Sequence, residues 1–433
     1  MIELRGLSIP LSGETRLPPD KSISHRALIH SMLAPGESIL FNLPDSADVQ
    51  STLKCIQQCG AKASEENGVL RVTGVGFRGI TGLGIKLDAG NSGTTARLMS
   101  GVMAMQPVPT TIYGDTSLSR RPMNRIILPL RQMGCNISGT DNGTLPISIE
   151  PADKFHPLTR YELPVASAQL KASLLLAAMH LEDESLIIES VGTRDHTERM
   201  LGIEKEIRDG KEYLRVSRKD YPVATEYHIP GDPSSAAFLI AAAVIRNGSH
   251  IAIHDVLLNP RRLAFIEILR DWGANIETIP VGESNNESFG TMIIRSSELV
   301  PKPIASEMVA SIIDEIPMLA IMAAFGDGAF CIRNASELRM KETDRISATA
   351  HNLRALGLEI DEFPDGFAFS CSGTRVKQAV FQSFGDHRIA MSCGVAAMNL
   401  ENGALIDSLE SVKISFPDFL KTMQSLTEYK WLK

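Results

Sequence analysis

The amino-acid sequence predicts an α/β protein of two domains, each built from three copies of one small folding unit. Helices rich in alanine, leucine and methionine recur at intervals of about 65–85 residues, which is longer than a solenoid repeat. The expected helix starts lie near Ser22, Gly93, Ser167, Pro233, Ile316 and His387. Short alternating segments follow these helices and have the pattern of half-buried strands. Six small units fit two three-fold domains more naturally than one large sheet.

A second helix in several of the units ends in a glycine turn that leads into another strand. The glycines that end these helices are Gly60, Gly134, Gly273 and Gly357. The repeated unit is therefore predicted as strand, helix, strand, helix, strand, strand. We expect an N-terminal lobe of residues 21–227 and a C-terminal lobe of residues 1–20 plus 228–433, with a cleft between them. Residues before Pro18 are expected to supply a strand to the C-terminal lobe.

The composition is that of a globular protein with an acidic balance. The chain has 433 residues, of which 43% are hydrophobic and 22% are charged, and its net charge is -8. An acidic chain binds nucleic acid and anionic membranes poorly, so neither is expected as a partner. Apolar runs such as residues 236–245 are too short to span a bilayer, and the charged N-terminus has no signal-peptide core. Six cysteines without a Cys-x-x-Cys pair indicate reduced thiols in a cytoplasmic protein.

Residues with useful chemistry gather before the expected helices, and the first such segment is the densest. Lys21 and Ser22 lie where the first helix begins, behind a possible cap at Asp20, and Arg26 lies about one turn further along. Free backbone N–H groups, the positive end of the helix dipole, an ammonium and a guanidinium favour binding of a phosphate or carboxylate. A capped helix with solvated basic residues explains this segment equally well.

Other segments in the first half have the same character. Residues 90–97 are rich in glycine but match neither a nucleotide P-loop nor a nucleophile elbow, which leaves an anion-binding turn or a plain tight turn. Arg121 precedes a proline in an extended loop, where its planar guanidinium suits bidentate anion binding or is simply solvated. Arg194 stands at a helix start and is available for an anion, whereas His196 has no partners at metal-ligand spacing.

The second half adds carboxylates to the cations. Lys341 and Arg345 share a helix face if their segment is helical, and Glu342 between them suits proton transfer, although a surface ion-pair helix is the commoner explanation. Asp314 lies among apolar residues, where it is either a proton-transfer group or a helix cap. Arg388 follows the start of the last apolar helix. Because such groups precede almost every equivalent helix, we expect the helix starts to form one site for two anionic ligands.

Taken in order, these segments resemble the 5-enolpyruvylshikimate-3-phosphate synthase family, the 3-phosphoshikimate 1-carboxyvinyltransferases. The matching motifs are Lys21-Ser22 through Arg26, Gly90-Asn91 with Gly93-Thr94, Arg121-Pro122-Met123, Ser167 with Gln169, Lys341 through Arg345, and Asp386-His387-Arg388. The resemblance implies the enolpyruvyl transferase fold, with two inside-out α/β domains of three βαβαββ units each, closing on the substrates. It also implies enolpyruvyl transfer from phosphoenolpyruvate to the 5-hydroxyl of shikimate 3-phosphate, a step of the shikimate pathway to aromatic amino acids and the target of glyphosate.

The resemblance assigns roles to individual residues. It implies that shikimate 3-phosphate is bound by Lys21, Ser22, Arg26, Ser167, Ala168, Gln169, Arg194, Asp314 and Lys341. It implies that phosphoenolpyruvate is bound by Lys21, Gly93, Arg121, Gln169, Arg345 and Arg388. Asp314 would act as the base and Glu342 as the acid, and Lys21 would assist either step. No metal or organic cofactor is implied, the two small-molecule substrates are the expected partners, and we expect a monomer.

Three departures from the family pattern qualify this assignment. Ala168 stands where many members have a second serine, so one phosphate contact must come from the backbone or be lost. Ile414 stands where many members have a lysine, and Lys413 precedes it. Several motifs resemble a second subclass that includes glyphosate-tolerant enzymes, yet tolerant members often carry alanine where Gly93 stands. We hypothesise that Gly93 leaves room for the phosphonate of the inhibitor.

Two other functions share parts of this pattern. A UDP-N-acetylglucosamine enolpyruvyl transferase has the same fold but usually carries a cysteine on a mobile loop, and residues 114–121 contain none. An RNA-binding relative of the repeat is disfavoured by the net acidity and by the lack of stretches that combine aromatic and basic residues. We also expect the lobes to close on binding, because six separated segments cannot all reach one ligand in an open form.

Overall fold

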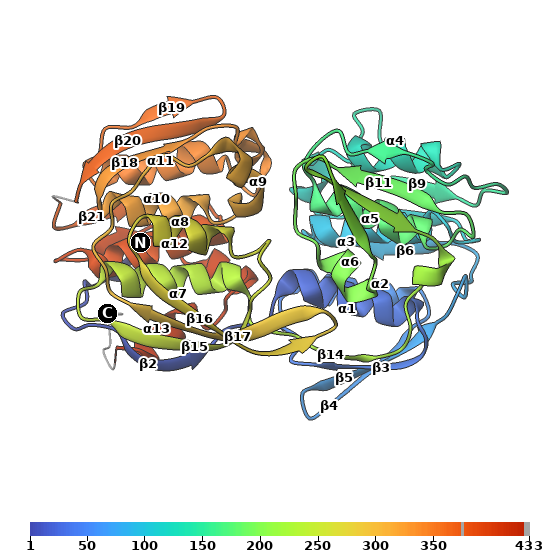
Figure 1. The fold of residues 1–433 in the computed structure, drawn as a ribbon, viewed down its shortest axis with the longest axis horizontal. Coiled ribbons are helices and arrows are strands. Elements are labelled where there is room, and N and C mark those ends of the chain that lie inside the picture. Colours follow the sequence, from blue (N-terminus) through green and yellow to red (C-terminus); the bar gives the residue numbers. More distant parts are fainter. Residues whose placement is uncertain (374–375, 428–433) are drawn as a thin grey trace. The chain divides into compact units, whose positions relative to one another are not determined.

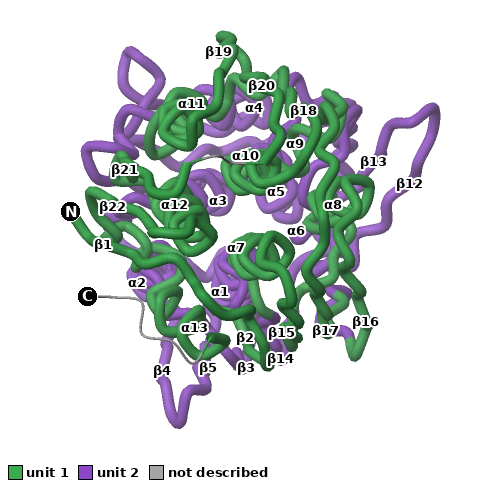
Figure 2. Tube along the Cα trace, turned by 90° about the vertical axis from the view of Figure 1, so that its left-hand side faces the viewer, with its two compact units in different colours: residues 1–18, 231–282, 288–433 green, residues 19–230, 283–287 purple. Residues whose placement is uncertain are grey.

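The computed structural model describes residues 1–373 and 376–427 and divides the chain into two units (Figures 1 and 2). Unit 1 comprises Met1–Pro18, Gly231–Gly282 and the chain from Ser288 onward, and unit 2 comprises Pro19–Pro230 and Glu283–Glu287. These bounds differ from the expected lobes by a few residues at each crossing. They also assign the tip of a hairpin, residues 283–287, to unit 2, where Glu287 forms an ion pair with His196.

Unit 2 contains three copies of one folding unit, in which strand, helix, strand, helix and a final hairpin follow one another. The first copy consists of α1 (Lys21–Leu33), β3 (Pro35–Phe41), α2 (Ala47–Gln58), β4 (Lys62–Glu66) and β5 (Val69–Val75). The second consists of β6 (Ile85–Asp88), α3 (Gly93–Met103), β7 (Thr110–Tyr113), α4 (Asn124–Gln132), β8 (Asn136–Ser138) and β9 (Ile147–Glu150). The third consists of β10 (Tyr161–Glu162), α5 (Ala168–Ala178), β11 (Ser185–Glu189), α6 (His196–Leu201), β12 (Lys205–Arg208) and β13 (Lys211–Val216).

The first copy in unit 2 is completed by a strand from the far end of the unit. Strand β14 (Glu226–His228) pairs in parallel with β3, with Tyr227 opposite Leu40. The three sheets then have equivalent strand orders, which are β14-β3-β5-β4, β6-β7-β9-β8 and β10-β11-β13-β12. Strand β14 thus takes the place in the first sheet that β6 and β10 hold in the second and third. The chain therefore returns to the first sheet before it leaves the unit.

Unit 1 follows the same plan with shorter sheets. Its strands are β1 (Ile2–Leu4), β2 (Ser12–Arg16), β15 (His250–Leu257), β16 (Asn275–Ser284), β17 (Glu287–Arg295), β18 (Asp327–Ile332), β19 (Asp361–Phe363), β20 (Gly366–Ser372), β21 (Ala379–Phe381) and β22 (Ala404–Ile406). Its helices are α7 (Pro233–Ile245), α8 (Ala264–Asp271), α9 (Val309–Ile312), α10 (Ile316–Ala324), α11 (Arg345–Ala355), α12 (His387–Asn399) and α13 (Phe419–Ser425). The sheets have the orders β16-β17-β15-β2, β18-β20-β19 and β1-β22-β21, so two of them have three strands. Both strands that precede Pro18 lie in this unit.

The apolar helices begin where the sequence predicts, and short polar side chains cap α1, α3, α5, α7 and α12. The Asp20 carboxylate accepts a hydrogen bond from the Ile23 N–H at the start of α1, and Asp232 and Asp386 cap α7 and α12 in the same way. Ser92 and Ser167 cap α3 and α5. Helix starts in both units are therefore fixed by local chemistry.

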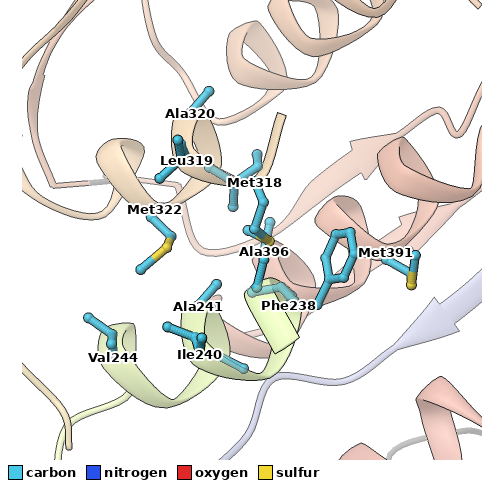
Figure 3. Packing of buried hydrophobic residues seen from close by; sticks show 14 of the residues in the cluster. Phe238, Ile240, Ala241, Val244, Met318, Leu319, Ala320, Met322, Met391 and Ala396 are labelled. Carbon is cyan, nitrogen blue, oxygen red and sulfur yellow. The ribbon is translucent and has the colours of Figure 1, made fainter. Parts of the chain in front are cut away.

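The central helices of unit 1 are apolar on nearly every face and form its core. Figure 3 shows side chains of α7, α10 and α12 packed against one another, among them Phe238, Ile240, Met318, Leu319 and Met391. A helix that is apolar all round has to be buried, and each large side chain so buried contributes about 1.5–3 kcal/mol. The sheets lie on the outside of the helices in this unit (Figure 1), as the inside-out fold requires.

Two further features concern the cysteines and the helix lengths. The six cysteines are free thiols, and burial raises the pKa of Cys55 and of Cys135 to about 12, which makes both thiols unreactive. Among the residues that the structure describes, no helix is long and apolar enough to cross a membrane.

Candidate functional site

The start of α1 presents three of the predicted binding residues. Lys21 and Ser22 lie in the first turn, directly after the cap, as the sequence predicts. The ammonium of Lys21 forms an ion pair with Asp48 of α2, with 2.7 Å between Nζ and Oδ2. About a quarter of the Lys21 side chain is exposed, so it is held in place and still accessible.

Arg26 lies one turn further along α1 and is buried. Its Nη1 donates to the backbone carbonyl of Ser22 at 2.8 Å, and its Nε donates to the hydroxyl of Thr197 on α6 at 2.7 Å. Burial lowers the pKa of Arg26 to about 10, and Arg194 shifts it in the same direction, so Arg26 is still a cation at neutral pH. Arg194 lies between β11 and α6, just before the helix starts. Two guanidinium groups near each other suit a phosphate dianion.

The start of α3 is linked to the start of α5 through one glutamine. The Nη1 of Arg97 donates to Oε1 of Gln169 at 2.6 Å, and Nε2 of Gln169 donates to the Thr94 hydroxyl at 3.0 Å. Ser167 caps α5 by accepting from the Leu170 N–H at 3.3 Å. Ala168 is the first residue of that helix and offers only its backbone, in a turn whose N–H groups lack partners within the helix.

Arg121 and Gly93 form the other part of this cluster. Arg121 follows the short 3₁₀ helix η1 (Leu118–Arg120), and its Nη2 donates to Oδ1 of Asn91 at 3.0 Å. A Cβ on Gly93 would lie 2.8 Å from Nη1 of Arg97 and 3.6 Å from Nη1 of Arg121. A side chain at this position would crowd the Arg97 guanidinium, so glycine allows that group to lie against the start of α3.

The predicted residues of unit 1 meet around one buried arginine and one aspartate. Nε of Arg345 donates to Asp386 at 2.7 Å, Nη2 to Glu342 at 2.6 Å and Nη1 to Asp314 at 3.3 Å. Burial opposes the charge of Arg345, but the attraction of Asp386, Glu342 and Asp314 outweighs it and raises its pKa above the usual value. Arg345 is thus a permanent cation held by three carboxylates.

Asp314 also faces two further cations. Its carboxylate lies 3.5 Å from Nζ of Lys341 and 3.8 Å from Nη2 of Arg388, whose Nη1 donates to the Asp314 carbonyl at 3.1 Å. Arg388 also lies 3.7 Å from Glu315. Although its neighbours in the sequence are apolar, Asp314 has a polar environment, because other segments supply the charged side chains around it.

The structure corrects one local expectation and leaves one residue outside both clusters. Lys341 and Arg345 do not share a helix face, because the 3₁₀ helix η4 (Ser336–Met340) ends before Lys341 and α11 begins at Arg345, capped by Asp344. Lys413 is an exposed residue that pairs with Glu410 at 2.8 Å. Nothing in its surroundings indicates a role in binding.

Sequence reasoning missed Arg97 and the anchoring role of Asp386. Arg97 follows Gly93 by four residues, the spacing that separates Ser22 from Arg26, and this repeat was a usable signal. Asp386 is predicted only as part of the motif with His387 and Arg388, since its pairing with Arg345, 41 residues away in the sequence, depends on the fold. Among the described residues, no group of three or more metal-ligating side chains occurs.

Two three-fold α/β units that each present basic side chains at the starts of their central helices define a class of enzyme that binds small anionic substrates. The sequence model of EPSP synthase (3-phosphoshikimate 1-carboxyvinyltransferase) matches residues 7–423, and the chain belongs to this family. This confirms the family and the fold that the motifs predict.

Known relatives and structures agree over nearly the whole length. The 3-phosphoshikimate 1-carboxyvinyltransferase of Salinibacter ruber is 41% identical over 422 residues, covering 97% of this chain and 98% of that protein. The protein of the same name from Syntrophomonas wolfei is 41% identical over 428 residues, covering 96% and 98%. A solved structure of EPSP synthase from Acinetobacter baumannii is 33% identical, covers 98% of both chains and has a TM-score of 0.86.

Proposed function

We infer that this protein transfers the enolpyruvyl group of phosphoenolpyruvate to the 5-hydroxyl of shikimate 3-phosphate and releases phosphate. The observation that carries this inference is the family match across residues 7–423. The reaction belongs to the biosynthesis of aromatic amino acids. A UDP-N-acetylglucosamine enolpyruvyl transferase is not favoured, because relatives with about two fifths of their residues identical carry the other name.

We propose that the phosphate of shikimate 3-phosphate binds in unit 2, between Arg26, Arg194 and the start of α5. Arg26 donates hydrogen bonds to a hydroxyl and a carbonyl, and the carboxylates of Glu198, Asp20 and Glu287 favour its charged form, so it is a cation that can attract an incoming anion. Ser167 and Gln169 supply a hydroxyl and an amide at the start of α5, and the backbone N–H of Ala168 replaces the missing second serine. The full set for this substrate adds Lys21, Ser22, Asp314 and Lys341.

Phosphoenolpyruvate is proposed to bind to Lys21, Gly93, Arg121 and Gln169 of unit 2 and to Arg345 and Arg388 of unit 1. Gly93 lies beside the guanidinium groups of Arg97 and Arg121, and because it has no side chain, nothing from this position covers either group. Paired arginines bind carboxylate and phosphate oxygens in a planar, bidentate manner. Lys413 has no part in this proposal.

The chemistry requires a base, an acid and cations, and unit 1 offers the first two side by side. In the addition step, Asp314 takes the proton of the 5-hydroxyl, the oxygen bonds to C2 of phosphoenolpyruvate, and Glu342 gives a proton to C3. In the elimination step, C3 loses a proton and the C2–O bond to phosphate breaks. Cations at the phosphate, with Lys21 among them, stabilise the charge that develops there. The contacts of both carboxylates to Arg345 fix their positions.

A coupled assay of phosphate release tests the function directly. Purified protein with phosphoenolpyruvate should release phosphate when shikimate 3-phosphate is added and should release none with UDP-N-acetylglucosamine. Phosphate release with UDP-N-acetylglucosamine alone would overturn the proposed acceptor. Release with neither acceptor would show that the protein is not an enolpyruvyl transferase for either of them. The expected cytoplasmic location and monomeric state are separate predictions, which cell fractionation and sedimentation test.

A further inference from the structure

A lysine with no role in the proposed mechanism is completely buried in the third repeat of unit 2. Only 1% of the Lys171 side chain is exposed, and its Nζ lies 2.7 Å from Oε2 of Glu189 and 2.7 Å from Oε1 of Glu198. Both carboxylates are buried as well. Taking three charged groups out of water is costly, and apolar residues of similar volume often serve a core at least as well. Stability alone therefore does not explain this cluster.

The two glutamates hold the segment that carries Arg194 at both of its ends. Oε1 of Glu189 accepts from the N–H of Thr193 at 3.1 Å and from its hydroxyl at 2.5 Å, and Thr193 directly precedes Arg194. Glu198 lies four residues after Arg194, in the first turn of α6. The position of the Arg194 backbone is therefore set by groups that meet at the ammonium of Lys171.

Lys171 itself belongs to the first turns of α5, which carry the other predicted phosphate contacts. Its backbone N–H donates to the carbonyl of Ser167 at 3.0 Å, and Gln169 lies two residues before it. Thr197, next to Glu198, accepts the hydrogen bond from Arg26. The elements that present Arg26, Arg194 and the start of α5 thus converge on one buried charge.

The charge on this lysine is maintained by its partners. Burial opposes the ammonium, but the attraction of Glu198 and Glu189 outweighs it and raises the pKa of Lys171. Lys171 therefore keeps its proton at neutral pH, whereas burial raises the pKa of Glu198. The buried cluster differs from the surface ion pair between Lys211 and Glu162 of the same repeat, in which both side chains are more than a third exposed.

We propose that Lys171, through Glu189 and Glu198, is a positioning residue that sets Arg194 against the start of α5 so that both reach the phosphate of the acceptor. This inference rests on the proposed function. Lys171 cannot touch the substrate, because it is covered. Its effect is expected on recognition of the phosphate and not on the binding of phosphoenolpyruvate.

The test compares two acceptors that differ only in the phosphate, shikimate 3-phosphate and shikimate. Lys171→Met alone would strand two buried carboxylates, so the main variant is Lys171→Met/Glu189→Gln/Glu198→Gln, in which the glutamine at 189 still accepts from Thr193. Glu198→Gln alone, which keeps the pair between Lys171 and Glu189, is the milder second variant. The matched control is Lys211→Met/Glu162→Gln at the surface. Circular dichroism and thermal melting check that each variant is folded.

We expect the ratio of kcat/KM for shikimate 3-phosphate to that for shikimate to fall by about 10–100-fold in the triple variant, the loss expected for a displaced charged hydrogen bond. KM for shikimate 3-phosphate should rise while KM for phosphoenolpyruvate changes less than threefold. Glu198→Gln should cause a smaller fall in the ratio, and the surface control should leave it unchanged. If the triple variant does not fold, the outcome rests on Glu198→Gln.

An unchanged ratio, or an equal loss with both acceptors, would overturn the positioning role. Arg194→Ala serves as the reference and should remove most of the discrimination. If Arg194→Ala keeps it, Arg194 does not bind the phosphate and the inference about Lys171 fails with it. If the unmodified protein uses neither acceptor, the proposed function itself is wrong, which is a distinguishable result.

Discussion

The two units hold their basic side chains in different ways. In unit 2, Arg26 bonds to a hydroxyl and a carbonyl, Arg97 to an amide oxygen and Arg121 to another amide oxygen. In unit 1, the partners of Arg345 are all carboxylates. Arg388 also lies close to two carboxylates, those of Asp314 and Glu315. The same fold plan thus produces arginines that donate hydrogen bonds to neutral groups in one unit and an arginine held by carboxylates in the other.

This difference suggests a separate function for each unit, namely anion binding in unit 2 and proton transfer in unit 1. Cations with neutral partners keep their attraction for a phosphate, so unit 2 suits binding. In unit 1 the arginines fix the carboxylates Asp314 and Glu342 in place, so this unit suits proton transfer. Lys21, another predicted binding residue of unit 2, differs from these arginines, since its ammonium pairs with Asp48. The predictions that follow test this contrast, beginning with the largest effect.

Asp314→Asn should lower kcat by about 10²–10⁴-fold, because it removes the proposed base and one carboxylate partner of Lys341 and Arg388. Phosphate release under saturating substrates measures the effect. Asp361→Asn, the same change at an exposed position in β19, is the control and should leave kcat unaltered. If Asp314→Asn kept more than half of the activity, the assignment of the base to Asp314 in unit 1 would be wrong.

Arg345→Met and Arg26→Met should differ in their cost to folding. Loss of Arg345 strands the buried carboxylate of Asp386, so we expect the free energy of unfolding to fall by about 3–5 kcal/mol. Loss of Arg26 leaves only a hydroxyl and a carbonyl without their donor, for which we expect about 1–3 kcal/mol. Unfolding in urea measures both. Equal losses would show that the contrast in partners has no energetic consequence.

His30→Leu should stabilise the protein against acid. His30 is buried in α1, burial lowers its pKa to about 3, and neither ring nitrogen has a hydrogen-bond partner among the described residues. A histidine with a depressed pKa in the folded state contributes full stability above pH 6.5, which is lost as the pH falls toward 3 because the unfolded chain binds the proton first. At pH 5 this loss is about 2 kcal/mol, and the leucine variant avoids it.

Unfolding free energies at pH 7 and pH 5 provide the measurement for this histidine. His351→Leu, at an exposed position of α11 in unit 1, is the matched control and should leave the pH dependence as it is. If His30→Leu and His351→Leu behave alike, the burial of a neutral histidine is not a source of acid sensitivity in unit 2.

Gly93→Ala should have the smallest effect on turnover but a clear effect on inhibition. The added methyl group would lie 2.8 Å from Nη1 of Arg97, whose guanidinium is held by Gln169, so Arg97 would have to shift. We expect KM for phosphoenolpyruvate to rise by about tenfold, equivalent to about 1.4 kcal/mol, and inhibition by glyphosate to weaken at least as much. Steady-state kinetics with and without the inhibitor check this. Unchanged sensitivity would show that the phosphonate does not bind beside Gly93.

Local chemistry made most of the framework predictable. Caps such as Asp20, Asp232 and Asp386 mark helix starts within three residues of sequence, which is why the repeat could be recognised before any contact was known. The contact between Arg97 and Gln169 joins residues 72 apart and depends on how α3 and α5 pack. Pairings of that kind have no sequence signature.

Two further features also depended on the folded chain. Strand β14 completes the first sheet from the other end of unit 2, and three residues give too little pattern to show this. The polar setting of Asp314 arises from segments that follow it by about thirty and seventy residues, so its apolar neighbours in the sequence indicated the wrong environment.

The account depends most on the claim that basic groups from both units bind one pair of small anions. A crystal structure with shikimate 3-phosphate and glyphosate bound tests it directly. We predict Arg26 and Arg194 at the phosphate of the first ligand, and Arg121 together with Arg388 at the second. Ligands bound by residues of a single unit, with Lys21, Arg121, Lys341 and Arg388 pointing to unrelated places, would contradict it.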